Sequence, residues 1–176
     1  MPMNSFILQT FNGISYAALL FLLASGFTLT FGLMRIVNMA HGAYYLLGGY
    51  IGLSVAKATG NFGFALIAGG VAAALLGFIA DKVLIKRAGD NHLSQVLITV
   101  GLAYVVGDVT LKIWGGDALK LPVPIWLRGV VELPGGIVYP IFRFFLTAIG
   151  VVVALLLWLL YRKTQIGAAI RAGVDD

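Results

Sequence analysis

Cysteine is absent from the 176 residues, which excludes disulfides, cysteine-ligated metals and thiol chemistry. Charge is also scarce, because Asp, Glu, Lys and Arg make up only 11% of the residues, against about 25% in soluble domains. Residues 1–34 carry no charge, and neither do residues 58–80 or 144–161. A soluble chain of this length has no core large enough to bury so much apolar surface. The sequence therefore predicts a membrane protein.

Long apolar stretches take the place of the missing charges, and 60% of the residues are hydrophobic. The hydrocarbon core of a bilayer takes about 20 apolar residues per helix. Backbone polar groups in lipid must be satisfied within the segment, so we expect helices rather than strands. The sequence predicts an all-α, polytopic transmembrane helix bundle, one domain over residues 1–176. Its five expected segments are Gly13–Met34, Tyr44–Ala58, Phe62–Val83, Leu93–Trp114 and Ile141–Tyr161.

Small residues recur every four positions in several of these segments, and such stripes let helix backbones approach closely in lipid. They predict tight intramolecular packing at Ala65, Gly69, Ala73 and Gly77, at Gly48 and Gly52, and at Gly150 and Ala154. The longest connection, Gly115–Pro140, contains several prolines and glycines and is expected to be an ordered surface loop with little helix.

Positive charges in the loops indicate the orientation of the chain. With the N-terminus outside, the cytoplasmic side carries seven Lys and Arg residues and the outer side five; the seven are Arg35, Lys82, Lys86, Arg87, Arg162, Lys163 and Arg171. We therefore expect an outer N-terminus and a cytoplasmic C-terminal tail. The net charge of +5 is spread over the loops, which favours contact with anionic lipid rather than with nucleic acid.

The segment Gly32–Gly42 is the first specific polar feature. Arg35, Asn38 and His41 follow at intervals of three, which places them on one side if the stretch is helical. Ionisable groups at membrane depth are costly and tend to line a bundle interior or an aqueous path. The alternative is an ordinary cytoplasmic turn, with Arg35 as a topology signal and His41 as an interfacial residue.

We expect Arg35–Gly42 to be a break between two helices, partly within the membrane, because the second apolar segment is short, the polar groups are spaced three apart and Gly42 lets the backbone turn. Transporters use discontinuous helices to present polar groups to small solutes. The amide of Asn38 can hydrogen-bond a zwitterionic solute, and neutral His41 can donate or accept. These residues are therefore candidates for a solute path. A lone histidine makes no metal site, and no catalytic residue, metal or cofactor is predicted.

The tail Arg162–Asp176 differs from the rest of the chain. Ile166, Ala169 and Ile170 fall at the spacing of one helix face, which predicts a short surface helix lying against another body. The alternative is a disordered basic tail.

Both polar segments resemble the inner-membrane permease subunit of branched-chain amino-acid ABC transporters. The first match is Gly32–Gly42 followed by Tyr45 and Gly48, and the second comprises Arg162, Thr164, Gly167, Ala169–Ala172 and Asp176. Two departures are Ala43, where the family often has Glu, and Ala168, where it often has Arg. The resemblance covers essentially the whole chain but only the N-terminal part of such a permease, so we expect the chain alone not to transport.

The resemblance implies a permease that pairs with a related permease in the inner membrane, with two cytoplasmic ATPase subunits and an extracytoplasmic solute-binding protein. It adds Tyr45 and Gly42 to the solute-path candidates. It also implies ATPase coupling through residues of the tail, namely Thr164, Gly167, Ile170, Arg171 and Asp176. The chain has no Gly-x-x-x-x-Gly-Lys-Ser/Thr loop, so hydrolysis must come from a partner.

Three other functions remain open. One is a permease for urea, short amides or another small polar solute. A second is an ATP-independent channel or carrier, which would need acidic residues at mid-membrane depth, where Asp108 is the only candidate and lies near the end of its segment. A third is a membrane scaffold without transport.

Overall fold

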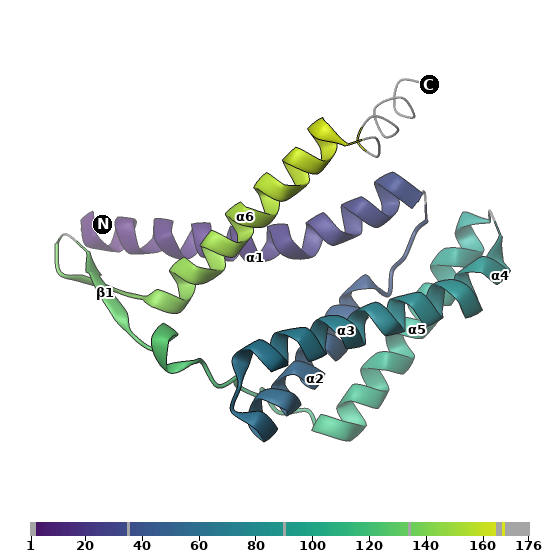
Figure 1. The fold of residues 1–176 in the computed structure, drawn as a ribbon, viewed down its shortest axis with the longest axis horizontal. Coiled ribbons are helices and arrows are strands. Elements are labelled where there is room, and N and C mark those ends of the chain that lie inside the picture. Colours follow the sequence, from purple (N-terminus) through teal and green to yellow (C-terminus); the bar gives the residue numbers. More distant parts are fainter. Residues whose placement is uncertain (1–2, 35, 90, 134, 165–166, 168–176) are drawn as a thin grey trace. The chain divides into compact units, whose positions relative to one another are not determined.

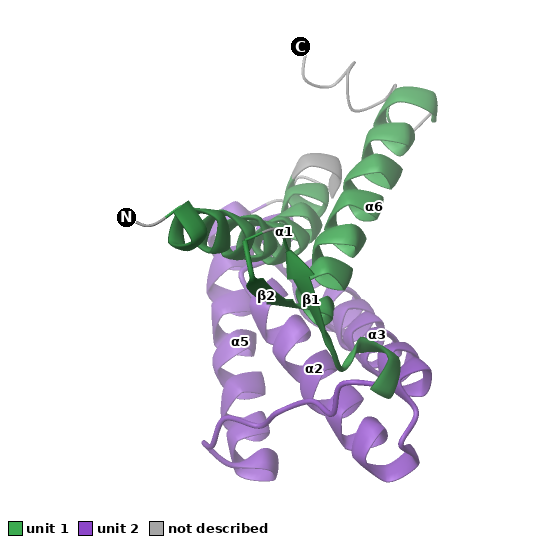
Figure 2. Cartoon of the chain, turned by 90° about the vertical axis from the view of Figure 1, so that its left-hand side faces the viewer, with its two compact units in different colours: residues 1–33, 125–176 green, residues 34–124 purple. Residues whose placement is uncertain are grey.

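The computed structural model describes residues 3–34, 36–89, 91–133, 135–164 and 167. The chain divides into two compact units (Figure 2). Unit 1 comprises residues 1–33 and 125–176, and unit 2 comprises residues 34–124. The order of the elements along the chain can be followed in Figure 1.

Unit 2 is built on an antiparallel pair of helices, α2 (His41–Thr59) and α3 (Phe62–Ala80). Gly60 ends α2 in the left-handed conformation, with φ of 68°, which glycine adopts without steric cost. Asn61 then caps α3, because its side-chain oxygen accepts from the backbone nitrogens of Gly63 at 2.8 Å and Phe64 at 3.2 Å. The two-residue connection therefore folds the helices against each other.

The small-residue packing predicted for these helices is confirmed. A Cβ atom added to Gly48 would lie 2.8 Å from the carbonyl oxygen of Gly69, and one added to Gly69 would lie 2.6 Å from that of Gly48. A turn further along, a Cβ on Gly52 would lie 3.0 Å from the carbonyl oxygen of Ala65. The two backbones are thus in direct contact, with no room for a side chain between them.

The chain continues from α3 without a break into a π-helical turn, Asp81–Ile85, and then α4 (Lys86–Ala88). After Gly89, α5 (His92–Trp114) begins under the cap of Asn91, whose side chain accepts from the backbone nitrogen of Ser94 at 3.1 Å. This helix packs on α2 and on the π-helical turn, and the ring of Trp114 stacks on that of Tyr50. Unit 2 is therefore a bundle of three long helices.

Unit 1 joins α1 (Met3–Met34), a 3₁₀ turn (Ile125–Leu127), two strands and α6 (Ile141–Lys163). The helices α1 and α6 cross in both views of the chain (Figures 1 and 2). Ser15 of α1 contacts Thr147, and a Cβ on Gly150, one turn further along α6, would lie 2.9 Å from the Cβ of Ala18. Contacts advance together along both helices, so the two run in the same general direction.

Buried hydroxyls hold this crossing together. The Tyr139 hydroxyl donates to the carbonyl oxygen of Phe11 at 2.8 Å and lies 2.9 Å from the Ser15 hydroxyl. The Ser15 oxygen is also 3.1 Å from the hydroxyl of Thr147. Tyr139 is only 1% exposed, and its ring packs edge-on against Phe144. Every polar atom named here has a partner, as burial demands.

The connection Gly115–Pro140 has little helix, as expected, but it contains a hairpin that the sequence analysis did not predict. Strand β1 (Val130–Leu133) pairs antiparallel with β2 (Ile137–Pro140), with Val131 opposite Tyr139. Gly135 and Gly136, with φ of 92° and 72°, make the tight return possible. The missed signal was Pro-Gly-Gly between two runs rich in β-branched residues.

Within the part of the chain that the structure describes, four helices are long and apolar enough to cross a membrane: Met3–Phe31, Phe62–Ala88, His92–Trp114 and Ile141–Lys163. The predicted all-α transmembrane bundle is confirmed, with two corrections. Helix α1 begins at Met3 rather than Gly13, because its first turns contain no residue that breaks a helix. Helix α2 corresponds to the second expected segment, but its many glycines and tyrosines keep its hydropathy below that of the four spanning helices.

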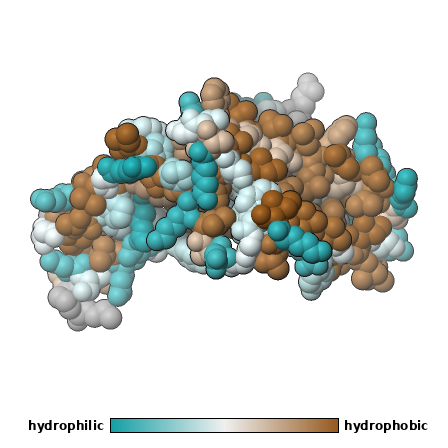
Figure 3. Space-filling model, turned by 90° about the horizontal axis from the view of Figure 1, so that it is seen from below, coloured by the Kyte–Doolittle hydropathy of each residue, from teal (hydrophilic) through white to brown (hydrophobic). Residues whose placement is uncertain are grey.

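Large apolar side chains cover the outside of these helices, as lipid contact requires. Figure 3 shows brown, apolar residues over much of one face. On α3, Ile67 and Leu75 are 65% and 56% exposed, and on α6, Leu155 and Leu156 are 55% and 59% exposed. In water such a surface would be unstable, whereas in a bilayer it is solvated by acyl chains.

Candidate functional site

The predicted break between the first two helices is confirmed over residues 36–40. Residues 36–38 have no regular structure, Met39 and Ala40 form a turn, and α2 begins at His41. His41 and Gly42 therefore belong to the first turn of α2 and not to the break itself. Because residues 36–40 are not helical, the three-residue spacing of the polar groups does not place them on one helix face.

Asn38 explains why the helix stops here. Its side-chain oxygen accepts from the backbone nitrogen of Ala40 at 3.0 Å, which is a local turn that competes with helical hydrogen bonding. Its amide nitrogen donates to the hydroxyl of Tyr44 at 3.3 Å. Asn38 is 8% exposed, and so is Tyr44. Asn38 thus ties the break to the start of α2.

Thr99 of α5 anchors the break from the other side. Its hydroxyl oxygen accepts from the backbone nitrogen of Met39 at 3.0 Å, and its own hydrogen reaches the carbonyl oxygen of Gln95 at 2.8 Å. Thr99 is fully buried. A small apolar cluster surrounds this polar contact, and it consists of Ala40, Tyr44 and Ala80 packed against Ala73, Leu76, Leu102 and Ala103. The break is therefore clamped between the ends of α3 and α5.

Gln95 completes this polar group one turn before Thr99. Its amide nitrogen donates to the carbonyl oxygen of Gly89 at 2.8 Å, whereas its side-chain oxygen is buried and has no partner among the described residues. Sequence reasoning missed both Gln95 and Thr99. The available signal was two hydrogen-bonding side chains four residues apart within an otherwise apolar helix.

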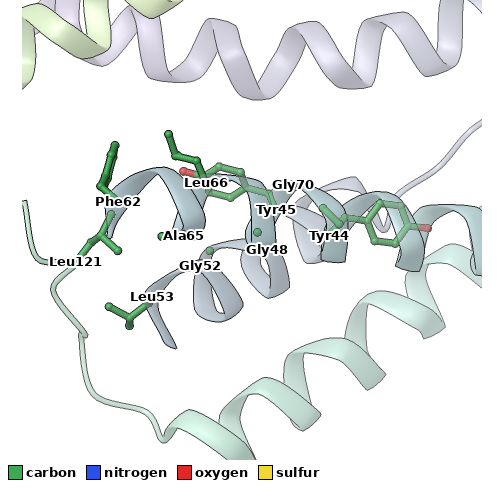
Figure 4. A pocket seen from close by; sticks show the side chains of 13 residues that line it. Tyr44, Tyr45, Gly48, Gly52, Leu53, Phe62, Ala65, Leu66, Gly70 and Leu121 are labelled. Carbon is green, nitrogen blue, oxygen red and sulfur yellow. The ribbon is translucent and has the colours of Figure 1, made fainter. Parts of the chain in front are cut away.

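A shallow groove of about 290 Å³ runs along the contact between α2 and α3, beginning one turn after the break (Figure 4). Its floor is formed by glycines of both helices, and Tyr45, Leu66 and Phe62 stand along it. Tyr45, one of the predicted solute-path residues, is 61% exposed and contributes the hydroxyl. Asn38, His41 and Gly42 do not line this groove. The groove suits an apolar group about the size of an aliphatic side chain.

The predicted coupling residues lie at the other end of the chain. Helix α6 ends at Lys163, and Thr164 donates its hydroxyl to the carbonyl oxygen of Leu160 at 2.6 Å. The backbone nitrogen of Gly167 in turn donates to the Thr164 hydroxyl oxygen at 3.2 Å. Thr164 thus closes the end of α6. Ile170, Arg171 and Asp176 lie outside the described residues.

Long apolar helices that pack through glycine backbone contacts define a multi-pass helical membrane protein. The family described as the permease component of the branched-chain amino acid transport system matches residues 9–176. The chain belongs to this family, which confirms the resemblance seen in its two polar segments.

Three relatives show how far the similarity extends. The probable branched-chain amino acid transport permease protein LivH of Methanocaldococcus jannaschii is 28% identical over 173 residues, which cover 93% of this chain and 53% of that protein. The high-affinity branched-chain amino acid transport system permease protein LivH of Escherichia coli K12 is 24% identical, over 66% of this chain and 41% of that protein. The corresponding permease protein BraD of Pseudomonas aeruginosa is 21% identical, over 97% of this chain and 60% of that protein. The chain spans about half the length of the curated relatives it matches. No solved structure matches it.

Proposed function

We propose that the chain is part of a permease subunit of an ATP-driven importer for branched-chain, or related hydrophobic, amino acids, and that it forms the solute path with a second permease. The observation that carries this proposal is the family match over residues 9–176. The names of the three relatives, all branched-chain amino acid permeases, support the choice of solute. The proposed location is the inner membrane, with the N-terminus outside.

The energy source in this proposal is a pair of separate cytoplasmic ATPase subunits, because this sequence contains no phosphate-binding loop of its own. The tail after Lys163 is the proposed contact, through Thr164, Gly167, Ile170, Arg171 and Asp176. The hydrogen bonds from Thr164 to Leu160 and from Gly167 to Thr164 support it, since they hold Gly167 against the last turn of α6. An extracytoplasmic binding protein delivers the solute.

The solute path is proposed to run along the start of α2, past His41 and Gly42 and into the groove at Tyr45. An aliphatic side chain would lie over the glycine floor, where no Cβ atoms limit its approach, and the Tyr45 hydroxyl supplies a polar contact at the side. Asn38 then serves as a positioning residue, because both ends of its amide are already bound within unit 2.

Gly70→Leu tests this path. A Cβ on Gly70 meets no atom within 4 Å, so the fold accommodates the side chain, which then occupies the groove. We expect leucine uptake by cells carrying the complete transporter to fall roughly tenfold or more, because the introduced side chain takes the space that the solute side chain would occupy, and a lost contact of about 1.4 kcal/mol is a factor of ten. The matched control is Gly101→Leu on α5, where a Cβ is also unobstructed and which does not line this groove.

The possible outcomes distinguish a wrong solute from a wrong solute path. Uptake of urea or a short amide in place of leucine by the native transporter would favour the runner-up function. Leucine uptake that is normal in both variants, at equal protein level, would retain the transporter and refute the groove as its path.

A further inference from the structure

A second groove, of about 550 Å³, opens in the angle between α1 and α6 of unit 1. The two helices contribute both polar and apolar walls to it: Asn12, Tyr16 and Leu19 from α1, and Phe142, Arg143 and Leu146 from α6. The hydroxyl network of Ser15, Tyr139 and Thr147 holds the crossing at its base. The groove is therefore part of a defined helix contact.

Arg143 gives this groove a positive charge that the neighbouring groups do not neutralise. Its guanidinium donates to the side-chain oxygen of Asn12 and lies 5.8 Å from the centroid of the Tyr139 ring. Both partners are neutral, and among the described residues no carboxylate lies within 4 Å of Arg143. Because a guanidinium carries five N–H donors, Arg143 keeps donors for an anion.

The position of Arg143 along α6 sets the depth of this charge. The helix Ile141–Lys163 has 23 residues and rises about 35 Å, a little more than the hydrocarbon core of about 30 Å. Arg143, in the first turn, therefore falls at the level of the lipid headgroups. Leu19 and Leu146 lie further along their helices and so face the acyl chains. The Arg143 cation at headgroup level matches the phosphate of a phospholipid, and the apolar walls deeper in the membrane match its acyl chains.

We propose that the groove between α1 and α6 binds an anionic phospholipid, with its phosphate on the guanidinium of Arg143 and an acyl chain against Leu19 and Leu146. Hydrogen bonds between an arginine guanidinium and a phosphate are charge-assisted, and they are stronger than hydrogen bonds between neutral groups. The apolar lower wall selects a lipid over a free phosphate ion or the carboxylate of a solute. This site does not depend on which solute the protein transports.

Arg143→Gln in the intact protein tests the site. The protein is purified from membranes, exchanged into nanodiscs of phosphatidylcholine and phosphatidylglycerol, and the retained lipids are counted by native mass spectrometry. Loss of the guanidinium should weaken retention of phosphatidylglycerol about tenfold, as expected for one charge-assisted contact, and leave phosphatidylcholine unchanged. The matched control is Arg128→Gln, which removes the same charge from unit 1 outside the groove.

Asn12→Asp provides a second test if Arg143→Gln fails to fold. It keeps an acceptor beside Arg143 but adds a carboxylate, which should compete with the lipid phosphate and cause the same loss. Equal retention of phosphatidylglycerol by the native protein and either groove variant would overturn the proposal. An equal loss in Arg128→Gln would overturn it as well, as would displacement of the lipid by millimolar inorganic phosphate or leucine.

Discussion

Replacing Gly69 with alanine should destabilise unit 2 at the contact between α2 and α3. The new Cβ atom would lie 2.6 Å from the carbonyl oxygen of Gly48, whereas an ordinary contact begins near 3.4 Å, so the helices must separate by about 0.8 Å. The obstructing atom is a backbone oxygen within α2 and cannot rotate away. Overpacking of this kind costs about 1–3 kcal/mol.

Gly70→Ala is the matched control for this prediction. Alanine has a helix propensity about 1 kcal/mol better than glycine, and both variants share this gain. A Cβ on Gly70 meets nothing within 4 Å, so only Gly69→Ala suffers the clash. The difference in stability between the two variants therefore isolates the cost of the backbone contact.

The assay is unfolding of the purified protein in mixed micelles with increasing SDS, followed by circular dichroism and tryptophan fluorescence. Gly69→Ala should unfold at a lower SDS fraction than Gly70→Ala, with a difference of about 1–3 kcal/mol in the free energy of unfolding. Identical midpoints would refute the reasoning, because the helices would then have room that the structure denies them.

Two further substitutions test the buried hydroxyls with the same titration. Tyr139→Phe removes the donor to the carbonyl oxygen of Phe11 and one hydroxyl beside Ser15, which keeps Thr147 as a partner. The change should cost about 0.5–1.5 kcal/mol, the net worth of a hydrogen bond; an unchanged midpoint would show that the network is not formed. Thr99→Val leaves the backbone nitrogen of Met39 without its acceptor and should lower the free energy of unfolding by a similar amount. Thr99→Ser keeps the hydroxyl and should stay near the native value. Equal stability of the valine and serine variants would contradict the contact between Thr99 and Met39.

The hairpin marks where prediction from the sequence failed. Its strands are only four residues each, and five of the eight residues are exposed, so they carry little periodic signal. What makes them strands is long-range: Tyr139 is buried because its hydroxyl reaches Phe11, and Gly135 accepts a hydrogen bond from Asn4 at 2.9 Å. None of these partners is near the hairpin in sequence.

For the break before α2, the sequence predicted part of the structure, and tertiary contacts decided the rest. The sequence predicted a break within Arg35–Gly42, because the second apolar segment is short and Gly42 lets the backbone turn. It did not predict that Met39 binds Thr99, or that His41 and Gly42 already belong to α2. A turn depends on its own residues, whereas a clamp depends on a helix about 60 residues away.

The sequence by itself determined that this chain is a multi-pass membrane protein of helices, and the small residues indicated which helix faces pack closely. The physical reason is that a bilayer acts on each segment separately: about 20 apolar residues must form their own backbone hydrogen bonds wherever the rest of the chain lies. Only the tertiary structure decided which polar atoms meet, such as Asn38 with Tyr44, Thr99 with Met39, and Arg143 with Asn12. Those contacts depend on the direction in which one helix crosses another, and no local pattern of residues encodes it.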